Sequence, residues 1–180
     1  METNNQSVTT TAGASLTIYD PEAMSRRLAH IRSVEAALGV REQFPTLGAL
    51  RREYGDYKAE AVVKLYLVDL SDLVNLKHPL SEKQIDRIAM EVVARYNTLT
   101  TADLHVIFSK AIAGDYGDFY ESLDVVKVLK WFSNYFKERC ATAAEMSQRE
   151  AERLYDKGGN MTSERMAQQF NDLAKKLNFK

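Results

Sequence analysis

The chain has 180 residues, of which 45% are hydrophobic and 27% charged, and its 24 basic and 25 acidic side chains leave a net charge of −1. This length suits one core-forming domain with an appendage, and the near-zero charge provides no whole-chain attraction to nucleic acid or anionic lipid. The single cysteine excludes an internal disulfide, and because the chain also lacks a secretory signal and an apolar run of membrane-spanning length, we expect a cytoplasmic protein that does not enter a membrane.

The N-terminal part predicts a tail followed by a helix. Residues 1–19 are mostly polar and lack periodicity, which is typical of a disordered tail. Asp20 then predicts an N-cap with Pro21 at the first helical position. Apolar residues recur at helical spacing up to Leu38, and Gly39 follows, which predicts one helix over 21–38. The side chains off this stripe, Arg26, Arg27, His30 and Arg32, are interpreted as a solvated basic face, with a phosphate or partner contact as the alternative.

Three further helices are predicted before residue 97. Thr46 follows Phe44-Pro45 and caps a short helix that ends at Gly55. Residues 57–76 are apolar around nearly the whole circumference of a helix, so we expect this helix to be buried on most sides and central to the bundle. Ser81 and Gln84 form a capping box that opens a helix of four turns.

The stretch 98–139 carries the most informative pattern. Thr100 and Asp103 predict an N-terminal cap for a helix over 102–113, which Gly114 stops. A structural aromatic turn follows, formed by Gly114, Tyr116, Gly117, Phe119 and Tyr120. A long helix over about 123–156, capped by Ser122, then carries a wide apolar stripe. Trp131 and Tyr135 lie at the margin of this stripe and are expected to be only partly buried.

No arrangement of residues predicts an enzyme, a cofactor or a metal site. His30, His78 and His105 lack metal-ligand spacing, and we expect His105 to be a surface or hydrogen-bonded residue. The carboxylates of Asp115, Asp118, Glu121 and Asp124 do not match a calcium-binding loop, so they are interpreted as turn and helix-terminus residues. Cys140 has no neighbouring histidine to activate it as a nucleophile.

Two segments are candidates for binding a partner. On the long helix, a basic and aromatic face could form a platform for nucleic acid, comprising Lys127, Lys130, Trp131 and Lys137 with Arg139 beside them. The alternative is a solvated face. Beyond a predicted flexible break at 156–160, a narrow seam suits pairing with another helix: Met166, Phe170, Leu173 and Leu177. This seam would bind a protein partner, mediate self-association or dock on its own bundle.

Several motifs resemble those of known proteins. They are LYLVDLSDLVNLK, LTTADLHVIF, the aromatic turn from Gly114 to Asp124, and the W-F-x-x-Y-x-x-E-R run from Trp131 to Arg139. Over residues 50–145 the chain resembles a family of small uncharacterised helical proteins of Bacteroidetes bacteria, their phages and their integrative elements. Residues 100–104 and the C-terminal helix are more weakly similar to phage helicase loaders and replisome organisers. The resemblance implies a helical accessory protein with no assigned catalytic residues.

Together these patterns predict an all-α protein, an irregular bundle of about six helices with a long helix and a C-terminal helical arm. The expected organisation is a disordered tail over 1–19, a helical bundle over 20–145, and a protruding helix end and arm over 146–180. We expect a non-enzymatic protein–protein adaptor of a phage or mobile element, which could serve DNA replication in the manner of a helicase loader. The alternative is a protein that binds nucleic acid directly through the lysine and aromatic face.

Overall fold

The computed structural model describes residues 19–74, 77–117, 123–159, 167–168 and 170–173. Its elements, in chain order, are α2 (Pro21–Arg27), α3 (Val34–Gly39), the 3-10 helix η2 (Arg41–Gln43), α4 (Leu47–Tyr54), α5 (Asp56–Leu73), α6 (Glu82–Arg95), α7 (Thr101–Ile112) and α8 (Val125–Gly159). Within the described ranges there is no strand, and Thr46 and Thr100 form an isolated antiparallel bridge. The predicted all-α fold is confirmed.

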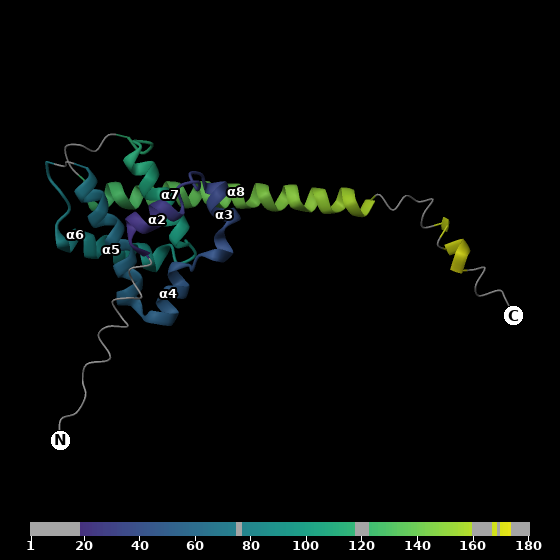
Figure 1. Ribbon diagram of the computed structural model, residues 1–180, viewed down its shortest axis with the longest axis horizontal. Helices are drawn as coiled ribbons and strands as arrows, with labels where there is room; N and C mark the ends of the chain where they lie inside the picture. Colours follow the sequence, from purple (N-terminus) through teal and green to yellow (C-terminus); the bar gives the residue numbers. More distant parts are fainter. Residues whose placement is uncertain (1–18, 75–76, 118–122, 160–166, 169, 174–180) are drawn as a thin grey trace, which may run out of the picture. The chain divides into compact units, whose positions relative to one another are not determined.

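The chain divides into two compact units, Met1–Cys140 and Ala141–Lys180, with the boundary inside α8. The first unit contains α2 to α7 and the beginning of α8 (Figure 1). Every described core residue belongs to this unit, because the last of them along the chain is Tyr135. The predicted domain boundary after residue 145 also falls within α8, whereas the predicted tail lies almost entirely outside the described residues.

The predicted single helix over 21–38 is wrong, because this region forms the two helices α2 and α3. Asp20 caps α2 as predicted, accepting hydrogen bonds from the N–H groups of Glu22 and Ala23. The Ser33 hydroxyl accepts a hydrogen bond from Ala36 N at 3.1 Å and begins a new helix. Serine favours such a cap over a place inside a helix, since its side chain competes for backbone hydrogen bonds. Leu28 and Ile31 remain buried in the intervening link, so the apolar stripe is used without a continuous helix.

The junction between α4 and α5 agrees with the sequence prediction. Thr46 Oγ1 accepts a hydrogen bond from Ala49 N at 3.0 Å, and Gly55 separates the two helices with φ 86° and ψ 167°. The α5 helix packs against α2, α4, α6 and α7, in agreement with its predicted place in the bundle. Val68 and Leu73 are nevertheless 46% and 63% exposed.

The central helix is α7, in which residues 101–108 are all buried. The capping box predicted for α6 is also present, between Ser81 and Gln84. On α7, Phe108 stacks on Tyr66 of α5 with ring centroids 5.2 Å apart, and it meets the edge of Phe132 of α8 at 6.1 Å. Neighbours therefore cover the first two turns of α7 on every side.

The long helix α8 begins and ends later than predicted. Asp124 Oδ1 accepts a hydrogen bond from Lys127 N at 2.8 Å, which is N-cap geometry, while the predicted cap Ser122 lies outside the described residues. At the other end, α8 runs to Gly159, so the predicted flexible break is wrong for residues 156–159. Extending an existing helix through glycine costs only about 1 kcal/mol per residue, because the unfavourable nucleation step has already occurred.

The Gly55 junction provides a stability test. Its φ and ψ fall in a region that is essentially restricted to glycine. Gly55→Ala should therefore lower the free energy of unfolding by about 1–3 kcal/mol through backbone strain, although a Cβ there would meet open space. The matched control is Gly39→Ala, since Gly39 is helical and equally open; this change should be neutral or stabilising. Equal losses in urea denaturation of the two variants would contradict this account.

Candidate functional site

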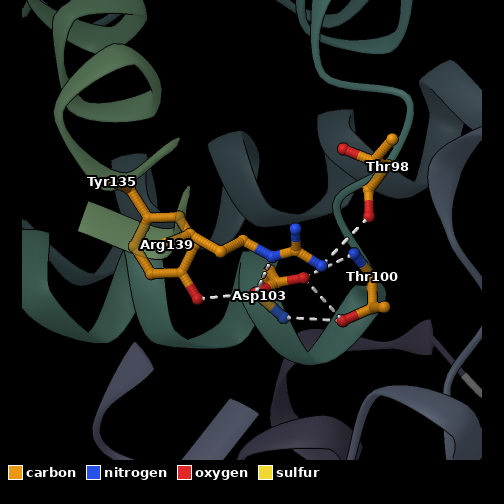
Figure 2. A network of polar contacts seen from close by, with 5 residues as sticks. All are labelled: Thr98, Thr100, Asp103, Tyr135 and Arg139. Atoms are coloured by element: carbon orange, nitrogen blue, oxygen red, sulfur yellow. Dashed lines mark hydrogen bonds and ion pairs between the residues drawn. The ribbon is translucent and has the colours of Figure 1, made fainter. Parts of the chain in front are cut away.

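A buried polar network joins α7 to α8, and its centre is the Asp103 carboxylate (Figure 2). On one side it completes the predicted capping box. Asp103 Oδ2 accepts hydrogen bonds from Thr100 N at 2.7 Å and from Thr100 Oγ1 at 2.9 Å. In return, Asp103 N donates to Thr100 Oγ1 at 3.2 Å. The N-terminus of α7 thus satisfies its own backbone donors, and a negative charge lies where the helix dipole favours it.

The other oxygen of this carboxylate binds α8. Asp103 Oδ1 accepts a hydrogen bond from Tyr135 Oη at 2.7 Å and from Arg139 Nε at 3.2 Å. Arg139 also reaches back to the carbonyl oxygen of Thr98 at 3.4 Å. The Asp103 side chain is 1% exposed and that of Arg139 14%. Figure 2 shows Tyr135 and Arg139 reaching Asp103 from α8, with Thr100 beside it at the start of α7.

This geometry makes the network structural. Removing a carboxylate from water is costly unless it is both paired and hydrogen-bonded, and here both oxygens have partners. Burial, together with the neighbouring Asp103 charge, raises the pKa of Tyr135 far above its ordinary value of 10.0, so the phenol remains a hydrogen-bond donor. The network joins α8 to α7.

Two predictions on α8 are wrong because both side chains bind the buried carboxylate of Asp103 on α7. Tyr135 is fully buried rather than partly exposed, and Arg139 belongs to the network rather than to a solvent-facing platform. The sequence analysis placed Arg139 beside the basic and aromatic face and did not pair its charge with Asp103. The signal was the i, i+4 spacing of Tyr135 and Arg139, which brings a hydroxyl and a guanidinium to one face.

Trp131 is also buried, at 4% exposure, so the prediction of partial burial is wrong. Its indole stacks on the Tyr116 ring with centroids 5.7 Å apart and planes 15° apart. Gly114 and Gly117 adopt φ values of 84° and 87°, and these turns bring Tyr116 back against α8. The described part of the aromatic turn thus contacts α8 through Tyr116, whereas Phe119 and Tyr120 lie outside the described residues.

In the candidate nucleic-acid face, the lysine side chains are exposed but the aromatic ring of Trp131 is buried. Lys127, Lys130 and Lys137 are all exposed, and their spacing along α8 places them on one side of the helix. A buried Trp131 offers no surface on which a base could stack. This face can therefore contribute charge but not the stacking that single-stranded nucleic-acid platforms use.

The second unit exposes the described members of the predicted seam. Phe170 is 77% and Leu173 61% exposed, while Met166 and Leu177 lie outside the described residues. On α8, Leu154 is 61% and Tyr155 80% exposed. None of the described residues of this unit is buried.

His105 is buried at 7% exposure and hydrogen-bonded to the backbone of Leu28, in agreement with the hydrogen-bonded alternative of the prediction. Burial lowers its pKa, and the Leu28 hydrogen bond partly opposes this shift.

Where side chains are described, no group of three or more His, Cys, Asp or Glu residues is placed to hold a metal ion; Asp118 and Glu121 lie outside that part. No helix within the described ranges is sufficiently long and apolar to cross a membrane.

Comparison with protein families, curated proteins and solved structures finds no match to this chain. The resemblances noted in the sequence therefore stay predictions.

The network predicts a large stability difference between two arginines. Arg139→Met should lower the free energy of unfolding by about 3–5 kcal/mol, since it leaves a buried carboxylate without its cation. Arg87→Met on α6 is the matched control, because Arg87 pairs with Glu91 while 60% exposed. This variant should change stability by less than about 1 kcal/mol. Similar losses for both arginines in chemical denaturation would mean that the ion pair with Asp103 is not stabilising.

The shifted pKa of Tyr135 predicts sensitivity to alkali. In the unfolded chain this phenol ionises near pH 10.0, whereas in the folded protein it keeps its proton. The contribution of Tyr135 to the free energy of unfolding is therefore fully present below pH 10.0. As pH rises above this value, the free energy of unfolding falls by about 1.4 kcal/mol per pH unit for each such group. Tyr135→Phe should reduce the slope of unfolding free energy against pH in this range. An unchanged slope would contradict the assignment.

Proposed function

We propose that the protein is a non-enzymatic adaptor whose second unit, Ala141–Lys180, binds a protein partner or a second copy of the chain. The observation that carries this proposal is the exposure of large apolar side chains on helices without a described core, Phe170 and Leu173 foremost. Such short helices are marginally stable alone in water. They are commonly stabilised when their apolar face is buried against another helix or in a groove.

The biological setting of this proposal comes from the resemblances. We place the protein in a phage or mobile element, acting in the cytoplasm, and a replicative DNA helicase is the first partner to test. Helix-in-groove binding needs a few apolar anchors at i, i+3 and i+4 spacing, and Phe170 and Leu173 have the i, i+3 relation. Because apolar burial dominates such a contact, the complex should survive high salt.

The test replaces both anchors with serine. Phe170→Ser/Leu173→Ser should leave the melting temperature of the bundle nearly unchanged and abolish self-association or capture of the helicase. The matched control is Leu73→Ser/Val126→Ser, which removes two apolar side chains that are 63% and 76% exposed in the first unit. This control should bind normally. Sedimentation velocity and pull-down with the purified helicase provide the measurements.

Two results would contradict the adaptor proposal. If the Phe170→Ser/Leu173→Ser variant melts several degrees lower and still binds, this segment is simply the last helix of the core. If the Leu73→Ser/Val126→Ser control loses binding equally, the contact is not specific to the second unit.

Direct nucleic-acid binding is a second candidate, favoured by the shared exposed face of Lys127, Lys130 and Lys137. Binding through charge alone should weaken steeply as salt rises, and replacing all three lysines with glutamine should reduce the salt slope by about 2–3. Because Trp131 is the only tryptophan and is buried, its fluorescence should not change on adding single-stranded DNA. Strong quenching would show that a base stacks on Trp131 and that the turn opens.

A further inference from the structure

A pocket of about 450 Å³ lies on the first unit, between α2 with the link that follows it and the C-terminal half of α7. Its polar lining comes from Ser25, Arg32, His105, Ser109, Lys110 and Asp115. Alanines and Ile112 supply the apolar part of the wall. A pocket of this size, mostly apolar and with a few converging polar groups, suits a small molecule. The split of the predicted helix into α2 and α3 creates it, because the link carries Arg32 and Ala29 to the pocket wall.

Hydrogen-bond donors predominate in this lining. Arg32 uses its Nε to donate to the carbonyl oxygen of Ala29 at 3.1 Å, and its terminal nitrogens have no partner among the described residues. Lys110 is held at the pocket by Glu138, whose two carboxylate oxygens lie 3.0 and 2.8 Å from its ammonium nitrogen. A guanidinium, an ammonium and the hydroxyls of Ser25 and Ser109 thus face one space.

His105 gives the pocket a group that can respond to charge. The imidazole Nε2 lies 3.5 Å from Ser109 Oγ, while the backbone of Leu28 holds the ring in place. The charged residues that line the same pocket are Arg32 from the link, Lys110 from α7 with its partner Glu138, and Asp115 from the following turn. An anion at Arg32 and the serine hydroxyls would accept hydrogen bonds from them and stabilise a protonated His105 imidazole, whereas the Asp115 carboxylate would repel it.

We propose that this pocket binds a small phosphate monoester, with Arg32, Ser25 and Ser109 contacting the phosphate and the apolar body lying against Ile112. Three phosphate oxygens match the number of donors better than the two of a carboxylate, and a guanidinium is the preferred partner of such a group. All of these residues belong to the first unit, so the site is independent of the adaptor surface and extends the proposed function.

The test is an NMR titration of the full chain with phenyl phosphate, with inorganic phosphate in parallel. The chain has three histidines, and the exposed His78, outside the pocket lining, serves as the internal control. Phenyl phosphate should shift the His105 ring signals saturably and raise the pKa of that imidazole, while His78 stays unchanged. It should bind more tightly than inorganic phosphate because it adds the apolar contact. No saturable shift of His105 with either probe would overturn the proposal.

Two variants separate a built site from general attraction between charges. Arg32→Gln should weaken phenyl phosphate binding by about tenfold or more, as expected for a lost charge-assisted hydrogen bond. The matched control is Arg41→Gln, because Arg41 is exposed on η2, outside the pocket, and the change in net charge is identical. Ser109→Ala should also weaken binding without changing the melting temperature. If Arg32→Gln and Arg41→Gln weaken binding equally, the anion is held by net charge and the proposal fails.

Discussion

The first unit depends on one buried carboxylate. Asp103 lies in the first turn of the central helix, where an unpaired charge would strongly disfavour folding. Its own capping box occupies one oxygen, and Tyr135 and Arg139 of α8 occupy the other. Such bonds require a single register of α8 along α7. This register also places Phe132 against Phe108 and brings Tyr96 within 5.9 Å of Phe132. A polar contact therefore specifies which apolar surfaces meet, while the apolar burial supplies most of the stability.

The two units differ in how they use apolar residues. In the first, every α-helix contributes buried apolar side chains to a common core, and a few large apolar side chains stay exposed. Scattered exposed residues are normal on protein surfaces and need no partner. In the second, the exposed Leu154, Tyr155, Phe170 and Leu173 lie in a unit none of whose described residues is buried. This contrast is the physical basis for assigning partner binding to the second unit rather than to the bundle.

The pocket between α2 and α7 depends on the interruption of the predicted helix over 21–38. Had residues 21–38 formed one helix, Arg32 would belong to a regular solvated face. Because Ser33 caps a new helix, residues 28–33 form a link, and this link brings Arg32 to the same pocket as His105 and Ser109. The packing of α7 also affects this histidine, because burial lowers the pKa of its imidazole.

The sequence by itself determined the elements whose signals are local. The caps at Asp20, Thr46, Ser81 and Thr100, and the glycine that separates α4 from α5, follow from hydrogen bonds and backbone angles within a few residues. Tertiary structure alone decided the rest. The burial of Trp131 depends on a tyrosine that a turn brings back from 15 positions earlier, and Arg139 finds its carboxylate 36 residues away. Helical periodicity reports which face of a helix is apolar, but it contains no information on which distant groups cover that face. For the same reason, it could not show that residues 101–108 of α7 are all buried.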